Sequence, residues 1–522
     1  MKKYLSTLLA VFITATLCAS FEEDVVKLNT LLSSDWNKHH LSPVAPAPDH
    51  VFLRRVTLDT KGVLPKAWEV RKFLADNSTD KRKRLIDSLL GSQEYAELMA
   101  MRYSDMFRIK SEFPINLWPN AVQAYHRYFL DNARRDRSFY TVTRELLTSN
   151  GSNFRVPAAN FFRASANRTP SGLAQSTLLS LLGMRYENLS DERKKAFEGF
   201  FQCIKFKSTD EWKEEIVYND NTSRTVKAGT PDGIDFTLKT PENDPRKFLA
   251  DWMTSPANRY FAKAYVNRVW SWFFGKGIVD PADDMPLPES FWDKITLSNA
   301  PGQQPANPEL LDFLADFFIK NNGSTKKLIK LILSSDAYNA DWKTVKAEQT
   351  LAEQRFAVYP VRRLESEILV DALSSVLGTF QSYSSVIPEP FTFLPRGTRA
   401  VQIADGSISS RMLDSFGRPP RDSGRISERK RIIDDSQRLF LMNSGWIYNN
   451  AAKFQKNHFH KHQKLNFNDR INLVYLTILS RPVTAKELKI IRKYELALSR
   501  RSILWNDLVW SLLNSKEFIY QH

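Results

Sequence analysis

Cysteine is the rarest residue in this chain of 522 residues, which contains only Cys18 and Cys203. Because Cys18 lies in a segment that we expect to be removed, the mature chain keeps one cysteine and no internal disulfide. Stability must then come from the burial of apolar side chains. No histidine stands near Cys203 in FFQCIKF to activate its thiol, so we expect a small buried apolar residue there rather than a nucleophile.

The sequence also lacks the short motifs of common catalytic sites. It has no Walker-type glycine loop, no H-E-x-x-H, no G-x-S-x-G and no Rossmann glycine fingerprint. S-x-x-K occurs at Ser78, Ser324 and Ser427 without the companion motifs, which indicates chance. No apolar run after the N-terminal segment is long enough to cross a membrane. The sequence alone therefore does not identify a reaction, and whether the protein is an enzyme stays open.

Residues 1–20 have the order of an export signal. Two lysines precede an apolar run over residues 5–17, and the small residues Ala19 and Ser20 follow. The run is short for a membrane span. We therefore expect cleavage after Ser20 and export to the periplasm or out of the cell. A lipid anchor on Cys18 is the less favoured alternative.

Acidic residues are outnumbered by basic ones, 58 to 74, which gives a formal net charge of +16. Removal of Lys2 and Lys3 with the signal leaves +14. Such a surface attracts anionic partners. For an exported protein we expect acidic or sulfated polysaccharides or a cell-surface component rather than nucleic acid. The alternative is that the excess lysines only keep the protein soluble.

Strand signals are scarce and helix starts are frequent. Asn307-Pro308-Glu309 combines a capping residue, a proline suited to the first turn and an acid at the positive helix end. Asp244-Pro245 and Ser255-Pro256 repeat this start. One small hairpin is predicted over residues 215–236, where β-branched residues flank turn-formers. The sequence therefore predicts a mainly α, multi-helical fold whose 34 Phe, 17 Tyr and 12 Trp fill well-packed cores.

We predict five parts along the chain. They are the signal peptide (1–20), a short helix with a Pro-rich linker (21–48), an N-terminal helical domain (49–214), a β-rich connector (215–243) and a C-terminal helical domain (244–522).

One sequence motif, which we call the repeated phrase, occurs three times: KRLIDSLLGSQEY at 83–95, KKLIKLILSSDAY at 326–338 and NDLVWSLLNSKEF at 506–518. In each copy, apolar residues form one helical stripe, and a serine follows where the next helix would be capped. The outer copies extend over 52–95 and 471–518 as a helical hairpin module. Because packing solutions are duplicated more readily than catalytic sites, we interpret the phrase as structural.

Three groups of side chains are candidates for chemistry. Carboxylates at Asp59, Asp283 and Asp284 could act as general acid and base, or they could only pair with lysines. The arginines of FGRPPRDSGRISERKR could grip carboxylate, sulfate or phosphate, or they could pair with acids of the core. These candidate binding residues are Arg418, Arg421, Arg425 and Arg429.

HFHKH places His458, His460 and His462 at alternate positions, where they could hold a transition metal. Neighbouring carboxylates and cysteines are lacking, however, so a solvated basic loop is the favoured interpretation and no metal site is expected.

Several long segments carry a family resemblance. They include FLRRVTLDTKGVLPKAWEVRKFLAD, RKFLADWMTSPANRYFAKAYVNRVWSWFFGKGIVDPADD, VRRLESEILVDAL, FGRPPR and DLVWSLLNSKEF. Together they resemble the planctomycete-type cytochrome-associated secreted proteins, which pair a PSCyt-type and a PSD-type domain of unknown function. The two helical domains predicted above match these in order. The resemblance implies an exported helical protein of bacteria that degrade complex polysaccharides.

The chain departs from this family at two places. Members usually carry C-x-x-C-H after the motif seen here as LLGMR, and C-x-C after GRPPR. The matching positions hold Asn188, Asp191 and Glu192 in the first segment, and Arg425 and Ser427 in the second. Because both cysteine pairs are missing together, the resemblance implies that they serve one haem or metal site, which this chain lacks. We expect no cofactor, and covalent haem c is excluded at this place without thiols.

Three functions remain open. The favoured one is a non-redox binding or accessory protein for anionic, possibly sulfated, polysaccharide or for the cell surface. The second is a glycan hydrolase or lyase that uses the aspartates, with Arg418 and Arg421 gripping acid groups. The third is electron transfer, against which the missing ligands argue. A groove with paired acids and nearby arginines would favour the enzyme, and a basic surface without one would favour the binding protein.

Overall fold

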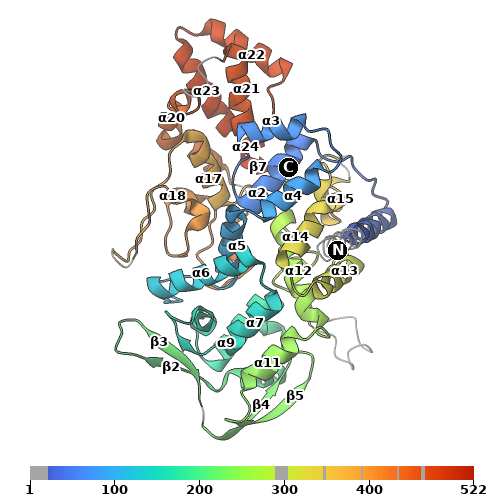
Figure 1. Cartoon of the computed structure of the whole chain (residues 1–522), viewed down its shortest axis with the longest axis vertical. Coiled ribbons are helices and arrows are strands. Elements are labelled where there is room, and N and C mark those ends of the chain that lie inside the picture. The colour runs from blue at the N-terminus through green and yellow to red at the C-terminus, as the bar shows by residue number, and fades with distance from the viewer. Residues whose placement is uncertain are drawn as a thin grey trace, which may run out of the picture.

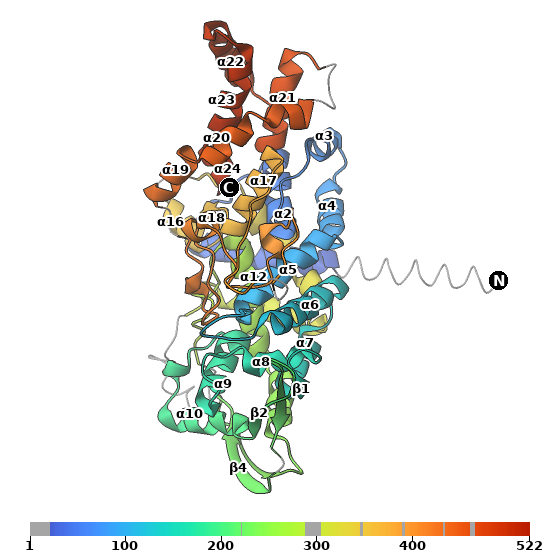
Figure 2. The same cartoon turned by 90° about the vertical axis from the view of Figure 1, so that its left-hand side faces the viewer.

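The computed structural model describes residues 21–220, 222–287, 304–344, 348–388, 392–431, 434–459 and 465–522. The molecule is elongated and consists mostly of helices (Figures 1 and 2), which confirms the predicted mainly α class. The predicted signal peptide lies outside the described residues. Among the residues that are described, no helix has the length and apolar character needed to cross a membrane.

A helix over residues 21–38 comes first. The next helices along the chain are α2 (Asp49–Lys61), α3 (Ala67–Ala75), α4 (Lys81–Leu90), α5 (Gln93–Met106), α6 (Pro119–Arg135), α7 (Phe139–Thr148), α8 (Asn160–Arg163), α9 (Pro170–Thr177) and α10 (Asp191–Glu198). Those that follow are α11 (Pro245–Thr254), α12 (Arg259–Phe274), α13 (Pro308–Lys320), α14 (Thr325–Ser334), α15 (Asp336–Asn339), α16 (Gln349–Gln354) and α17 (Ser366–Leu377). The last are α18 (Arg411–Ser415), α19 (Asp435–Met442), α20 (Gly445–Ala451), α21 (Phe467–Ile478), α22 (Ala485–Ala497), α23 (Arg501–Leu513) and α24 (Lys516–Ile519).

Two of the three predicted helix starts are confirmed. Asn307 caps α13 and Asp244 caps α11, and each side chain accepts a backbone N–H of the first turn. The predicted start at Ser255-Pro256 is wrong, because α12 is capped by Asn258 instead. The hydroxyl of Ser255 accepts the backbone N–H two residues later, and this turn keeps the segment out of the helix.

The strands form small antiparallel sheets. They are β1 (Gly151–Ser152), β2 (Ile204–Ser208), β3 (Glu215–Asn219), β4 (Arg224–Gly229), β5 (Asp235–Thr240), β6 (Arg362–Arg363) and β7 (Tyr520–Gln521). The predicted hairpin over 215–236 is only partly right, because β3 and β4 do not pair with each other. β3 lies between β1 and β2, and β4 pairs with β5. Each strand has a closer partner across a short turn, at 209–214 and at 230–234.

The three copies of the repeated phrase share one local structure. Ser92, Ser335 and Ser515 each accept the backbone N–H of the residue three positions later, at 3.2 Å. Each hydroxyl also donates to the carbonyl three positions earlier, at 2.6 or 2.7 Å. In the two longer copies, the backbone N–H groups of Lys66 and Thr484 donate to a glutamate three positions later. The phrase is therefore a helix-end module, as predicted.

Helix α2 connects the copies. The buried Arg54 donates to the carbonyls of Ile478 at 2.9 Å and Phe518 at 3.0 Å. Its neighbour Arg55 donates to the carbonyl of Tyr338. Phe518 and Tyr338 are the aromatic residues that end the third and second copies. In Figure 1, α2 accordingly lies between α21 and α24 on one side and α14 and α15 on the other.

Two apolar cores support the molecule. One consists mainly of residues between 28 and 359, and the other mainly of residues between 364 and 519. Each of them combines residues from both sides of the predicted connector 215–243. Helix α5 contributes to both, with Met106 in the first core and Met101 in the second. The boundaries of the five predicted parts stay a prediction.

Candidate functional site

The two segments in which the family resemblance places missing cysteines lie against each other. Nη2 of Arg425 is 3.4 Å from Oε1 of Glu187, beside Asn188. The backbone N–H of Ile426 donates to Asp283 at 2.8 Å. Asn188 in turn donates to Asp284 at 3.1 Å. The region around Asn188 and the region around Arg425 therefore form one site, although Asp191, Glu192 and Ser427 are exposed at its periphery.

A cavity of about 430 Å³ opens between these segments. Its wall comes from the turn before α9, from α9 itself, from the short helix η3 (Tyr186–Asn188) and from residues 422–425. We call it the polar cavity, because arginines, acids, hydroxyls and amides line it together. The polar side chains are Arg108, Arg185, Arg425, Glu187, Asp422, Ser165, Ser176, Ser423, Asn167 and Gln175.

Arg108 is the most unusual of these residues. Its residue surface is only 2% exposed. Nε donates to the carbonyl of Ala164 at 2.5 Å, and Nη1 donates to the hydroxyl of Ser180 at 2.7 Å. Within the described ranges, Nη2 has no hydrogen-bond partner and no carboxylate forms an ion pair with the guanidinium. Burial lowers the pKa of Arg108 to about 10, which leaves a cation without a counter-charge.

The loop over the polar cavity requires a glycine. Gly424 has a φ of +77°, and an added Cβ would lie 3.0 Å from Nη1 of Arg108 and 3.0 Å from the carbonyl oxygen of Met106. Any other residue would be strained and would push the loop away. The backbone next to Arg425 therefore packs directly onto Arg108.

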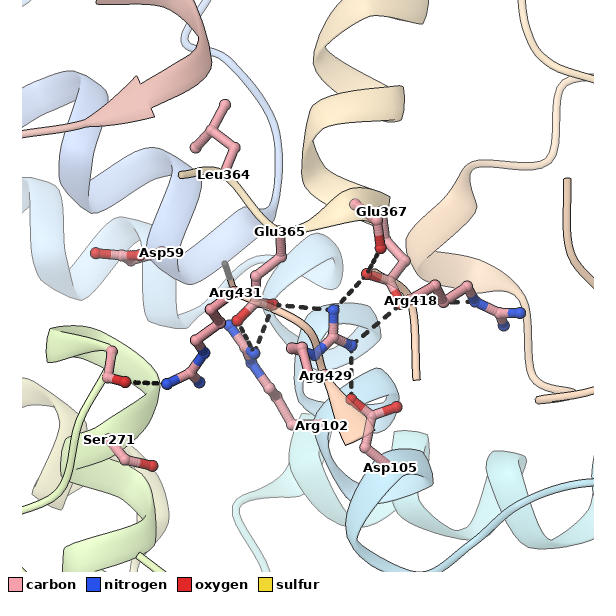
Figure 3. Close-up of polar contacts among 12 residues, drawn as sticks. Asp59, Arg102, Asp105, Ser271, Leu364, Glu365, Glu367, Arg418, Arg429 and Arg431 are labelled. Carbon is pink, nitrogen blue, oxygen red and sulfur yellow. Dashed lines mark hydrogen bonds and ion pairs between the residues drawn. The ribbon is translucent and has the colours of Figure 1, made fainter. Parts of the chain in front are cut away.

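Three of the four predicted binding arginines are internal. Arg429 donates to Glu367 and to Asp105, each at 2.6 Å. Arg421 donates to Asp105 at 2.8 Å, and Arg418 donates to the carbonyl of Asp405 at 3.1 Å. Figure 3 shows Arg429 between Glu367 and Asp105, with Arg418 beside Glu367. The three arginines follow the alternative interpretation, in which the arginines pair with acids of the core. Arg425 is the one that reaches the polar cavity.

Two acids of this network, Glu365 and Glu367, have pKa values well below the ordinary value. Burial acts to raise the pKa of Glu367, but the positive charges of Arg429 and Arg418 outweigh it and lower the pKa to about 2. Glu365 pairs with Arg102 at 2.6 Å, and its pKa is likewise far below the ordinary value, because the arginines outweigh burial. Glu365 and Glu367 were missed from the sequence. The only signal is that they interrupt the apolar run of LESEILVDAL.

The predicted catalytic acids are buried and engaged. Asp59 accepts hydrogen bonds from Tyr338 at 2.8 Å, from Tyr359 at 3.2 Å and from Arg362. Asp283 and Asp284 hold Ile426 and Asn188 as described above, and Arg185 lies 3.4 Å from Asp284. The contacts of Asp283 and Asp284 hold residues in and beside the wall of the polar cavity, whereas those of Asp59 lie elsewhere. A catalytic role for the three aspartates stays a prediction.

The remaining candidates lie elsewhere. Nε2 of His458 is 2.9 Å from the carbonyl oxygen of Val376, and the ring stacks on Phe454. His460 and His462 lie outside the described residues. In the part of the chain that the structure describes, no three His, Cys, Asp or Glu side chains group as metal ligands. Cys203 is buried, and burial raises the pKa of its thiol.

Comparisons with known proteins agree with the sequence resemblance. The family model PSCyt2, a protein of unknown function (DUF1549), matches residues 27–227. The family model PSD1, a protein of unknown function (DUF1553), matches residues 245–495. No curated protein and no solved structure matches the chain. Since the two matches stand in the predicted order and span most of the sequence, the chain belongs to the proteins that pair a PSCyt-type with a PSD-type domain of unknown function.

Proposed function

We propose that the protein is an exported, non-redox binding protein that holds an acidic sugar unit of an anionic polysaccharide in the polar cavity. The observation that carries this proposal is the buried guanidinium of Arg108, which lines the cavity and has no carboxylate partner among the described residues. A buried cation without a counter-charge is costly. A carboxylate or sulfate on the ligand would supply that charge.

The other groups in the wall suit the rest of a sugar. Ser165, Ser176, Asn167 and Gln175 offer donors and acceptors for ring hydroxyls. The half-exposed Arg425 also lines the cavity, and its guanidinium is a second group that can bind an acid group. A volume of about 430 Å³ lies in the range of small-ligand sites and suits a short oligosaccharide end. The net charge of +14 that is left after removal of Lys2 and Lys3 favours the approach of a polyanion.

Binding is favoured over glycan cleavage because of the state of the acids. A glycosidase needs two carboxyl groups free to act on the scissile bond. In the wall of the polar cavity, Glu187 pairs with Arg425 and accepts from Gln175 at 3.0 Å, and Asp422 pairs with Lys110 at 2.5 Å. Both carboxylates are thus already engaged with neighbouring side chains.

Titration calorimetry with defined oligosaccharides tests the proposal. Uronic and sulfated oligosaccharides should bind, and neutral ones of the same length should not. Arg425→Gln and Arg108→Lys should each weaken binding about 10-fold or more, since a hydrogen bond to a charged group is worth roughly 1.5–3 kcal/mol. Arg492→Gln is the matched control, because Arg492 lies on α22 at the far end of the molecule and contacts Asn468.

Two results would overturn the proposal. Equal affinity for neutral and acidic oligosaccharides would show that the charge of Arg108 does not contribute to binding. New reducing ends after incubation with the unmodified protein, lost on Glu187→Gln, would replace binding by hydrolysis.

A further inference from the structure

A second, smaller cavity adjoins the polar cavity, and Arg425 lines both. Its volume is about 40 Å³. Five arginines line it. Arg102 comes from α5, Arg268 from α12, and Arg425, Arg429 and Arg431 from the segment after Gly424. We call it the inner cavity. Figure 3 shows Arg102, Arg429 and Arg431 gathered in this region, with Ser271 on the neighbouring helix.

The positive charges around the inner cavity are only partly balanced. Arg102 pairs with Glu365, and Arg429 pairs with Glu367 and Asp105. Arg268, 4% exposed, donates from Nη2 to the carbonyl of Leu179 at 2.9 Å. Among the described residues, Arg268 forms no ion pair with a carboxylate.

The same holds for Arg431. It donates from Nη1 to the carbonyl of Gly275, and the described part of the chain provides no carboxylate within ion-pair distance of it. Two guanidinium groups therefore share the inner cavity without an ion-paired carboxylate among the residues that the structure describes.

The other acids that line the inner cavity do not balance the charges of Arg268 and Arg431. Asp105 already accepts from Arg421 and Arg429. Glu428 accepts from the backbone and the hydroxyl of Ser423, at 2.6 and 2.7 Å. Among the described residues, neither acid forms an ion pair with Arg268 or Arg431, and each of these arginines donates only one hydrogen bond. Water in the cavity would accept further hydrogen bonds from these arginines but would not neutralise the charge.

We propose that the inner cavity binds one small inorganic anion, a halide such as chloride, held by the guanidinium groups of Arg268 and Arg431. The volume of about 40 Å³ admits a particle the size of about one or two water molecules, which fits a monoatomic anion and is too small to enclose an organic acid such as gluconate. The ion ties α12 to the segment that carries Arg425 and Arg431. It is a structural ion, and its site shares only Arg425 with the lining of the polar cavity.

Thermal unfolding in matched salts tests this proposal. The protein is transferred to sodium gluconate, whose anion is too large for the inner cavity, and is titrated with chloride or bromide at constant ionic strength. The unfolding midpoint should rise in a saturable way by about 1–2 °C once the halide exceeds its dissociation constant about 10-fold. Arg431→Gln should remove this rise, and the control Arg492→Gln should keep it. Equal midpoints in gluconate and in halide would overturn the proposal.

Crystals of the unmodified protein in bromide give a readout that needs no variant. An anomalous bromide peak within hydrogen-bond distance of Arg268 and Arg431 is expected. If the inner cavity shows no bromide peak under saturating bromide, the proposal is wrong, and this result decides the question even where Arg431→Gln fails to fold.

Discussion

Replacement of Glu367 by glutamine tests the buried ion network most directly. Glu367 is 1% exposed and receives Arg429 at 2.6 Å, while Arg418 lies 3.6 Å away. Its pKa is lowered from 4.5 to about 2, and a shift of this size contributes about 3 kcal/mol to folding at neutral pH. Removal of one partner of a buried ion pair costs roughly 3–5 kcal/mol in other proteins. We therefore expect Glu367→Gln to lower the free energy of unfolding by about 3–4 kcal/mol at pH 7.

The pH dependence of this loss has a definite sign. Because the pKa of Glu367 is lower in the folded protein, its contribution is fully present above pH 4.5 and disappears as the pH falls toward 2. The difference between the unmodified protein and Glu367→Gln, measured by urea unfolding, should therefore be smaller at pH 3 than at pH 7. As a control, Asp131→Asn changes an exposed pair with Arg134 and should alter stability by about 0.5 kcal/mol or less. A loss below about 1 kcal/mol at pH 7, or the same loss at both pH values, would refute the reasoning.

Three further predictions concern other parts of the molecule. Replacement of Ser92, Ser335 or Ser515 by alanine should lower the free energy of unfolding by about 1 kcal/mol in each case, because each serine caps a helix in the same way. Urea titrations measure this loss, and unchanged midpoints would contradict the helix-end module. The Cys203 thiol should resist alkylation in the folded protein and react in urea, since it is buried and burial raises its pKa. Mass spectrometry measures the extent of alkylation in both states, and rapid labelling of the folded protein would contradict the burial. The purified protein should have no Soret band in its visible spectrum, because Asn188 and Arg425 stand where the family resemblance expects cysteines; a Soret band would reopen the electron-transfer alternative.

Features that depend on neighbouring residues were predictable from the sequence. The caps at Asn307 and Asp244 and the serines of the repeated phrase act on N–H groups two or three residues away. Such contacts need only the local chain, so the residue pattern determines them. The start of α12 was predicted wrongly for a related reason. Ser255 and Asn258 both suit a helix start, and the turn at Ser255 decides between them.

The role of each arginine was not predictable in this way. A guanidinium can pair with an internal carboxylate or bind a ligand, and the sequence FGRPPRDSGRISERKR is compatible with both. Arg429 became internal because the fold brings it to Asp105, 324 residues away in the sequence. Arg425 lines the polar cavity because Gly424 lets the loop pack on Arg108. Arg108 itself has a weak local signal, as a single arginine among apolar residues in MFRI.

The sequence by itself determined the helical class, the helix-end module and the family of paired domains, because periodicity, capping and long motifs are properties of the chain in order. Only the tertiary structure decided which charges are compensated. The free energy of a buried charge depends on every group within a few ångströms, and those groups come from distant segments. The two cavities therefore became visible only in the folded molecule, as did Arg108, Arg268 and Arg431, which have no ion-paired carboxylate among the described residues.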